Sequence, residues 1–433
     1  MQDGTKSIPK IFANIFIAFI GAGVLGVPYA FKEAGVIEGA IILGFIGLVS
    51  TRAMLLLIDC KYKILGKQPY NYQKLASEPD EKPAKQSNGN VVDVEVKELK
   101  PKINAHHDLE FGDLGYHALG KSGIVLVDGL VVLSQVGFCC AYLIFISENL
   151  TNFLPRFSRN QYLFAMVFPL IILTNVRQLK NLSIFSLFAD FANIFAYCVV
   201  FWFDFENFEK IGDDIHNYSA EGLPFFIGIA VYCYEGAGMI LSLESSVAKE
   251  CQSKFYGIFK LAMLVITLLY MTFGICGYLS FGENTKSIIT LNLPNGKFPV
   301  IVKSCLMFSL FFTYPVMMFP VSRILEMRLF NDPKTADYYK SSVVRSSLVL
   351  LTLVIVLTIP SFSTLMALIG SSCCILLAFI LPGLFHLRIF KGELTIYQKI
   401  LDYFLILLGI VTGCLGTRDA VERLFSKDNT AEI

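Results

Sequence analysis

Residues 21–28, Gly-Ala-Gly-Val-Leu-Gly-Val-Pro, interrupt the first long apolar segment of this chain, which extends from residue 11 to residue 33. A helix needs about 20 consecutive apolar residues to cross a bilayer, and this segment is long enough. Relative to alanine, a glycine weakens a helix by about 1 kcal/mol and a proline by about 3 kcal/mol. The stretch is therefore predicted to break a membrane helix near its middle and to expose backbone N–H and C=O groups.

Such a break survives in a membrane only where protein or a filled cavity surrounds the exposed backbone, because unpaired polar groups in hydrocarbon are costly. One interpretation of the stretch is half of a solute-binding site. The alternative is a simple kink or a groove for close helix packing, since glycine and proline are common in membrane helices. The first segment alone does not separate the two interpretations.

The composition predicts an all-α polytopic membrane protein. Of the 433 residues, 55% are hydrophobic and only 16% are charged, and the apolar segments of spanning length exceed what a soluble domain needs. Most of the 11 cysteines fall inside apolar segments and lack the spacing of metal ligands, so neither a metal site nor a cofactor is expected. The chain also has no catalytic motif, which argues against an enzyme, and no feature of a nucleic-acid binder.

Eleven membrane spans are expected, and they divide the chain into five regions. Residues 1–10 form a cytoplasmic tail, residues 11–60 hold spans 1 and 2, and residues 61–120 form a polar, largely disordered cytoplasmic loop. Residues 121–416 hold spans 3 to 11, and residues 417–433 form a luminal or extracellular tail. This orientation places most Lys and Arg residues of the loops in the cytoplasm.

Two N-x-S/T sequons, at Asn149 and Asn217, fall on the luminal or extracellular side in this topology. Both are candidate glycosylation sites.

A second break is predicted at residues 232–238, Tyr-Cys-Tyr-Glu-Gly-Ala-Gly, in the middle of span 6. It places the carboxylate of Glu235 near the bilayer midplane, where a charge costs roughly 2.5–3.5 kcal/mol and usually faces a cavity. Breaks in spans 1 and 6 divide the first ten spans into two five-helix halves of opposite topology. This arrangement is typical of inverted-repeat secondary transporters, whose solute site lies between the two broken helices.

The two breaks together predict the kind of solute. Free N–H groups at the start of a half-helix attract a carboxylate, and free carbonyls attract an ammonium group, so a zwitterion suits the pair. Because no Lys or Arg lies near the breaks and glycines leave little room, small neutral amino acids such as Ala, Gly, Ser and Pro are expected. The candidate substrate-binding residues are Gly21, Ala22, Gly23, Val24, Leu25, Tyr232, Cys233, Tyr234, Gly236, Gly238, Gln135 and Tyr314.

Glu235 is the first candidate for coupling to protons, because a carboxylate in an apolar cavity can exchange a proton during transport. Its alternative role is structural, as a permanently ionised group bound to neighbouring N–H groups. Asp190 in span 5 is the second candidate, with a packing hydrogen bond as the alternative. Ser309 and Thr313 have no acidic residue beside them, so no sodium site is predicted.

The chain resembles the amino acid/auxin permease family in six segments: GAGVLGVPYAFKEAG (21–35), VLSQVGFCCAYLIFISENL (132–150), SLFADFAN (186–193), YEGAGMILSLES (234–245), YLSFGENTKSIITLNLP (278–294) and LFFTYPVMMFPVSRILE (310–326). Its proton-coupled and vacuolar neutral amino acid transporter branches are the most similar. The resemblance implies a LeuT-type fold of 5+5 helices plus one C-terminal helix. It also implies proton symport of small neutral amino acids into the cytosol, across a vacuolar or lysosomal membrane or, alternatively, the plasma membrane.

Some proton-coupled members of the family use a histidine in helix 1, and Asn14 stands at the matching position, so that part of their mechanism does not transfer to this chain. A second hypothesis is an amino-acid sensor that binds solute at the same site with little or no flux. Its 61–120 loop would then recruit a cytoplasmic partner.

Overall fold

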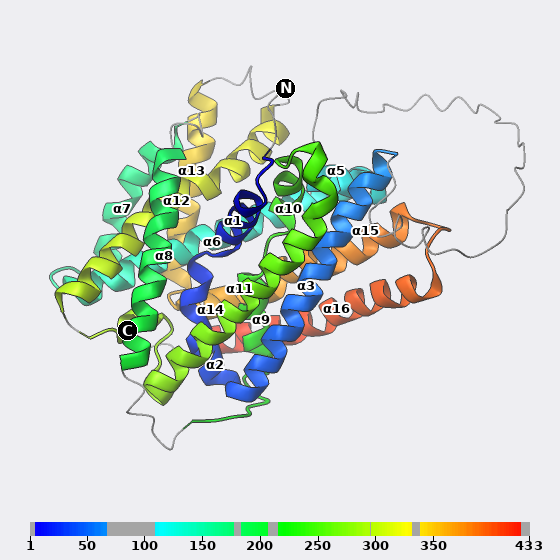
Figure 1. The fold of residues 1–433 in the computed structure, drawn as a ribbon. Coiled ribbons are helices and arrows are strands. Elements are labelled where there is room, and N and C mark those ends of the chain that lie inside the picture. The colour runs from blue at the N-terminus through cyan, green and yellow to red at the C-terminus, as the bar shows by residue number, and fades with distance from the viewer. Residues whose placement is uncertain are drawn as a thin grey trace, which may run out of the picture.

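The computed structural model describes residues 5–66, 109–176, 183–206, 215–294, 296–330 and 338–425. In these ranges the regular structure is helical apart from one isolated bridge between Thr5 and Val247. Figure 1 shows the helices gathered into one bundle. The all-α prediction is confirmed.

The bundle consists mainly of long apolar helices. They are α3 (Val36–Ile64), α6 (Lys121–Phe153), α7 (Arg159–Thr174), α8 (Ser183–Glu206), α11 (Gln252–Phe281), α12 (Lys297–Phe330), α13 (Tyr338–Thr358) and α16 (Ile396–Phe425).

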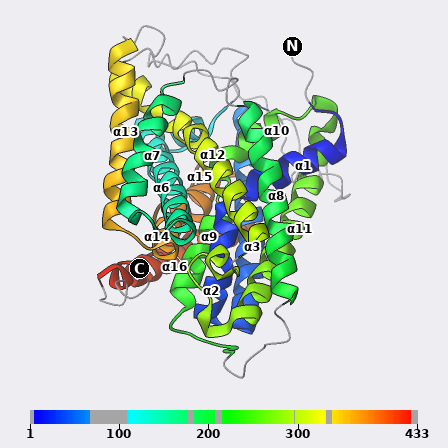
Figure 2. The same cartoon turned by 90° about the vertical axis from the view of Figure 1, so that its left-hand side faces the viewer.

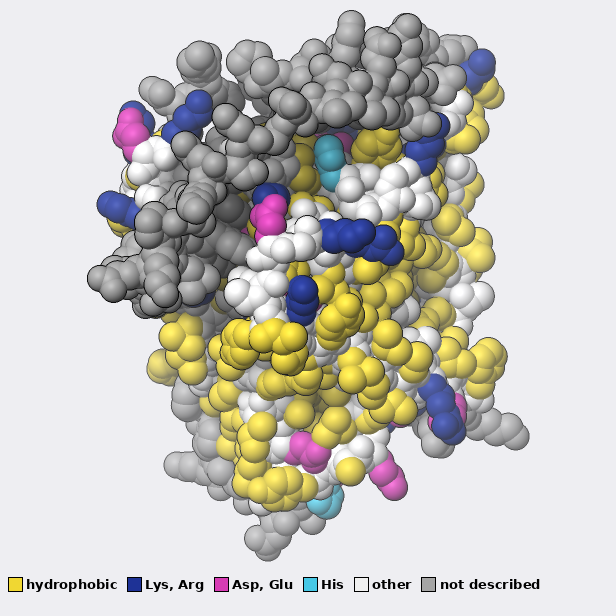
Figure 3. All heavy atoms as spheres, turned by 90° about the vertical axis from the view of Figure 1, so that its right-hand side faces the viewer, with side chains coloured by type: hydrophobic (Ala, Val, Ile, Leu, Met, Phe, Trp, Pro, Cys, Tyr) yellow, Lys and Arg dark blue, Asp and Glu magenta, His cyan; other side chains and the backbone are white. Residues whose placement is uncertain are grey.

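Within the described ranges, eight helical segments are long and apolar enough to cross a membrane, and a bent pair makes a ninth. The predicted spans 4 and 5 coincide with α7, which has 16 residues, and with α8, whose apolar part is Phe191–Phe203. The count of eleven spans stays a prediction. One face of the molecule carries hydrophobic side chains across its middle and charged ones toward its two ends, as a membrane protein requires (Figure 3).

Both predicted breaks are present. Helix α1 (Ile8–Phe19) ends before Gly21, a 3-10 turn η1 (Ala22–Gly26) follows, and α2 (Val27–Ala34) continues at an angle of 50°. In the sixth predicted span, α9 (Leu223–Cys233) ends and α10 (Ala237–Ser245) begins after three residues.

The bundle has two ends, the N-terminal face and the opposite face. The N-terminal face carries Thr5 and the end of α10, which the bridge to Val247 joins. The opposite face carries the end of α2 (Figure 2). There Gly35, at φ +87°, turns the chain against Asn217 so closely that a Cβ on Gly35 would lie 2.5 Å from the Asn217 carbonyl carbon.

Two π-helical turns, η7 (Gly370–Cys374) and η8 (Leu376–Ile380), join α14 (Phe362–Ile369) to α15 (Leu381–Ile389). At Gly370 this segment approaches α9 closely, because an added Cβ would lie 1.8 Å from the Gly228 carbonyl oxygen. Wide π turns often occur at functional sites. Here the first π turn itself makes the tight backbone contact with α9, the first half of the broken sixth span.

Several boundaries differ from the predicted regions. Helix α3 continues to Ile64, and α16 continues to Phe425, past the predicted start of the tail at residue 417. Helix α5 (Phe111–Leu119) occupies the end of the predicted 61–120 loop, and the Glu110 and Asp113 side chains cap its start. Residues 67–108 of that loop lie outside the described residues.

Candidate functional site

A cavity of about 80 Å³ lies between the two breaks. The broken helices supply most of its wall, and α6, α11, α12 and η8 complete it. Its lining residues are Ala18, Phe19, Gly21, Ala22, Gly23, Val131, Ser134, Gln135, Phe138, Tyr142, Tyr232, Cys233, Glu235, Gly236, Gly238, Met239, Tyr270, Met317 and Leu377. The wall therefore contains one carboxylate and no Lys or Arg.

The structure brings most of the predicted substrate-binding residues to this cavity. They are Gly21, Ala22, Gly23, Gln135, Tyr232, Cys233, Gly236 and Gly238, together with the predicted coupling residue Glu235. The two breaks therefore face one common space, although they are separated by about half the chain.

Four predictions for the cavity wall are corrected. Val24 and Leu25 are both 0% exposed in the core, because the 3-10 turn directs them away from the cavity. The Tyr234 hydroxyl donates to Thr267 Oγ1 at 2.9 Å, so its ring points to α11. Tyr314 is also fully buried, and its hydroxyl shares a 2.7 Å hydrogen bond with Thr352.

The first break presents hydrogen-bond donors. No acceptor is found among the described residues for the backbone N–H groups of Gly21, Ala22 and Gly23. Turn η1 continues directly into α2, so these groups lie at the positive end of a half-helix. A Cβ on Gly21 would meet nothing within 4 Å, which means that this residue borders open space.

The second break presents acceptors. Glu235 folds back onto the start of α10, where its Oε1 accepts from the Ala237 N–H at 3.1 Å and its carboxylate also binds the Gly238 N–H. Its other oxygen, Oε2, is buried without a hydrogen-bond partner in the described structure, and so is Oε1 of Gln135. Glu235 thus caps α10 and still leaves an acceptor in the cavity wall.

Two tyrosines that the sequence reasoning missed bind carbonyl groups at the breaks. The Tyr270 hydroxyl donates to the Phe19 carbonyl at 2.5 Å and lies 3.5 Å from the Cys233 carbonyl. The Tyr197 hydroxyl donates to the Gly21 carbonyl at 2.9 Å. Part of the backbone expected to bind an ammonium group is therefore already paired. No sequence signal marks these tyrosines, because both lie in unbroken helices.

The remaining predicted residues lie elsewhere. Asn14 is exposed on α1 and does not line the cavity, and the side chain of Asp190 lies outside the described residues. Asn149 is 0% exposed within α6, where its amide bonds the Phe145 carbonyl and the Thr290 hydroxyl. A glycan does not fit there, so that prediction is corrected. Asn217 is exposed in the segment before α9.

The sequence matches a family model described as "Transmembrane amino acid transporter protein" over residues 4–420. The chain belongs to this family. Among curated proteins it is 35% identical to "Amino acid transporter AVT3A" of Arabidopsis thaliana, with 97% of this chain and 91% of the relative covered. It is 27% identical to "Vacuolar amino acid transporter 4" of Saccharomyces cerevisiae, with 94% of this chain and 57% of the relative covered.

Solved structures confirm the LeuT-type fold. The chain is similar to the inward-facing conformation of Mhp1, with a TM-score of 0.58 at 9% identity over 99% of this chain and 94% of that one. It also resembles the Eremococcus coleocola manganese transporter, with a TM-score of 0.52 at 8% identity over 97% and 88%. At such low identity these likenesses concern the fold alone.

Proposed function

We propose that this family member is a secondary active transporter that moves small neutral amino acids into the cytosol by proton symport with alternating access. The observation that carries the proposal is the pairing of unbound donors and acceptors across one small cavity. The N–H groups of Gly21, Ala22 and Gly23 would bind the carboxylate of the solute. Oε2 of Glu235 and Oε1 of Gln135 would bind its ammonium group.

The size of the cavity supports a small solute. A water molecule needs roughly 10–15 Å³ of such space, so about 80 Å³ accommodates roughly five to eight groups of that size. Glycine and alanine have about this many heavy atoms. The rings of Phe138 and Tyr232, which contact each other at a centroid distance of 4.7 Å, limit one side and disfavour large side chains.

Glu235 supplies the proposed proton dependence. Its carboxylate holds the first N–H groups of α10 and also reaches the cavity. An ionised carboxylate accepts hydrogen bonds about twice as strongly as a neutral group. Protonation would therefore loosen the contact between Glu235 and the start of α10, which links the proton to the position of this half-helix around the bound solute.

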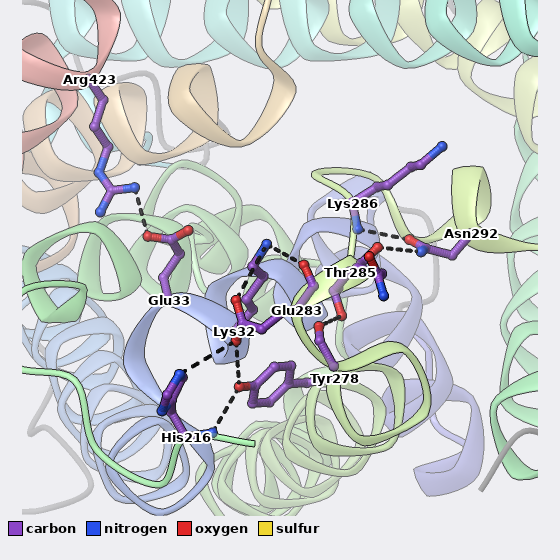
Figure 4. Close-up of polar contacts among 11 residues, drawn as sticks. Lys32, Glu33, His216, Tyr278, Glu283, Thr285, Lys286, Asn292 and Arg423 are labelled. Carbon is purple, nitrogen blue, oxygen red and sulfur yellow. Dashed lines mark hydrogen bonds and ion pairs between the residues drawn. The ribbon is translucent and has the colours of Figure 1, made fainter. Parts of the chain in front are cut away.

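The polar contacts at the opposite face support a state that is closed there. The Lys32 ammonium donates to the Glu283 carbonyl at 2.7 Å, and the Tyr278 hydroxyl donates to Glu283 Oε1 at 3.2 Å (Figure 4). The Arg423 guanidinium binds Glu33 Oε2 at 2.7 Å. We infer that solute leaves this state toward the N-terminal face, which the proposed topology places in the cytosol.

The membrane is proposed to be that of a vacuole or lysosome, because a yeast relative is named a vacuolar amino acid transporter. The plasma membrane is the alternative. The protein would then have small neutral amino acids, protons and bilayer lipids as its partners, and Asn217 would carry a glycan on the luminal side.

The test is uptake of labelled alanine by liposomes that contain the purified full chain, with and without an inward proton gradient. We expect gradient-driven accumulation, with competition by Gly, Ser and Pro and little by Glu or Lys. Accumulation that ignores the gradient would overturn the symport, and equal competition by Glu or Lys would overturn the substrate class. Binding of alanine without flux would identify a sensor instead.

A further inference from the structure

A second and larger cavity, of about 520 Å³, lies at the opposite face. It shares no lining residue with the central cavity. Its wall comes from the end of α2, the end of α6, the start of α7 and the segments before α12 and α14. The lining residues are Lys32, Glu148, Thr151, Asn152, Arg159, Glu283, Asn284, Thr285, Lys286, Ser287, Leu291, Pro360 and Ser361.

Two charged residues of this wall, Lys32 and Glu283, interact with each other. Oε1 of Glu283 accepts a hydrogen bond from the Tyr278 hydroxyl, and Oε2 lies 3.9 Å from the Lys32 ammonium. This ammonium also donates to the Glu283 carbonyl. Figure 4 shows this cluster. Lys32 and Glu283 therefore close the face of the bundle and contribute little net charge to the cavity.

The other cations in or beside the wall have fewer hydrogen-bond acceptors and anions around them. Nε of Arg159 is buried without a hydrogen-bond partner among the described residues, and the guanidinium otherwise reaches only the Val356 carbonyl, at 3.5 Å. The ammonium of Lys286 points away from the Glu283 cluster, and no dashed line reaches it (Figure 4). Lys303 does not line the cavity; it is only 5% exposed and donates to Oδ1 of Asn152, a lining residue, at 3.2 Å.

Arg159, Lys286 and Lys303 form no ion pair within 4 Å among the described residues. Glu148 acts electrostatically on Arg159. Lys286 and Lys303 also lie close enough to repel each other. A buried cationic donor that lacks an acceptor is costly, so an anion in this cavity would relieve both the repulsion and the unpaired guanidinium nitrogen.

We propose that this opposite-face cavity is a second binding site, which takes the carboxylate group of a small organic solute between Arg159 and Lys286. The guanidinium gives the directional hydrogen bonds that a carboxylate prefers, and the ammonium adds a nearby charge. The hydroxyls of Thr151, Ser287 and Ser361 suit the polar remainder of a small solute.

This site extends the proposed function, and it rests on that function only for the identity of the solute. A cleft lined by charges of one sign raises the local concentration of counter-ions. A positively charged cavity at the closed end of the transport path would therefore concentrate carboxylates there before the central site becomes accessible. The carboxylate chemistry itself can be tested without transport.

The experiment measures binding of labelled alanine to the purified full chain in lipid nanodiscs. Gly21→Leu fills the open space of the central cavity, so the alanine that remains bound reports the opposite-face cavity. In this background we expect about one alanine per chain, with affinity lowered about tenfold or more by Arg159→Gln or Lys286→Gln. Arg159→Lys should retain part of the affinity. Lys297→Gln, at an exposed residue at the start of α12 outside the cavity, should leave it unchanged.

Competition identifies the chemistry that is recognised. Propionate, which has only the carboxylate, should displace alanine in the Gly21→Leu variant, whereas ethylamine should not. Equal displacement by chloride or phosphate would overturn the carboxylate assignment, and unchanged affinity in both charge variants would overturn the site.

The same measurements separate the two proposals. If the wild type binds no alanine in either cavity, the proposed substrate is wrong. Titration with propionate then tests the second site alone, and the absence of propionate binding overturns it.

Discussion

The Tyr270 hydroxyl donates to the Phe19 carbonyl, the last of α1, at 2.5 Å, and it lies 3.5 Å from the Cys233 carbonyl, the last of α9. One side chain from an unbroken helix therefore touches the C-terminal ends of both half-helices that precede the breaks. Because α1 and α9 belong to opposite halves of the repeat, this tyrosine couples the two halves at the central cavity.

Tyr270→Phe should weaken alanine binding about tenfold. The change leaves two buried carbonyls without their donor, and an unsatisfied buried group costs about 1–3 kcal/mol. Binding of labelled alanine to purified protein gives the affinity. Tyr403→Phe, on the exposed side of α16, serves as the control and should bind normally. Normal affinity in the Tyr270 variant would show that the hydroxyl does not hold the site.

Glu235→Gln should abolish accumulation of alanine driven by a proton gradient and preserve exchange of labelled for unlabelled alanine. The amide oxygen can still cap α10, but the side chain no longer exchanges a proton. Liposome uptake at several pH values measures both activities. Glu250→Gln, an exposed carboxylate of the N-terminal face, is the control. Gradient-driven accumulation that survives in the Glu235 variant excludes this carboxylate from coupling.

Gly21→Ala and Gly236→Ala should differ sharply, although both add one methyl group to a break. At Gly21 the methyl enters open space, so the protein should fold normally and prefer glycine over alanine more strongly than the wild type does. At Gly236 it would lie 2.3 Å from the Phe19 ring, so this buried ring or the backbone of the break must shift, and the melting temperature should fall. Uptake competition and thermal unfolding test the pair. Equal behaviour of the two variants would contradict the cavity geometry.

Lys61→Met should destabilise the protein by about 3–5 kcal/mol, because it leaves the buried Glu244 carboxylate without its cationic partner and with only the Tyr62 hydroxyl as a donor among the described residues. The two groups are 2.7 Å apart, with side chains only 6% and 1% exposed, and they join α3 to α10. The double variant with Glu244→Leu should recover most of the loss. Thermal unfolding of the four proteins completes the cycle, and additive losses would mean that the pair is not coupled.

Asn217→Gln should remove a glycan when the protein is made in eukaryotic cells, and Asn149→Gln should not change the glycan content. Asn217 is exposed, whereas the Asn149 amide is buried and bonded to Thr290. Gel mobility with and without glycosidase measures the difference. A mobility shift that persists in the Asn217 variant but disappears in the Asn149 variant would contradict the described position of α6.

The two breaks were predictable because their cause is local. Glycines and a proline weaken a helix wherever it lies, so residues 21–28 and 232–238 marked the cavity from composition alone. Which side chains face the cavity was less predictable, since an irregular segment has no fixed helical period. Val24, Leu25 and Tyr234 belong to the right stretches and point away from the cavity for this reason.

Apart from Gln135 of α6, the residues that unbroken helices contribute to the cavity were not predicted from the sequence. Tyr270 and Met317 reach the cavity because α11 and α12 pack beside the breaks, and nothing in their own segments marks them. The opposite-face cavity was not predictable for the same reason, because distant segments form it only when they pack together. Arg159 and Lys286 are more than a hundred residues apart and meet only in the folded bundle.

The self-capping of α10 by Glu235 makes the central cavity directional. The start of α10 is already bound by the protein's own carboxylate. Among the described residues that line the cavity, this leaves the N–H groups of the first break to bind the carboxylate of a solute. A solute would then bind in one orientation only, with its carboxylate toward α2 and its ammonium group toward α10. A simple acid would bind only the N–H groups of the first break, and a simple amine only the Glu235 carboxylate. A D-amino acid in the same orientation would have to place its side chain against the opposite wall of the cavity.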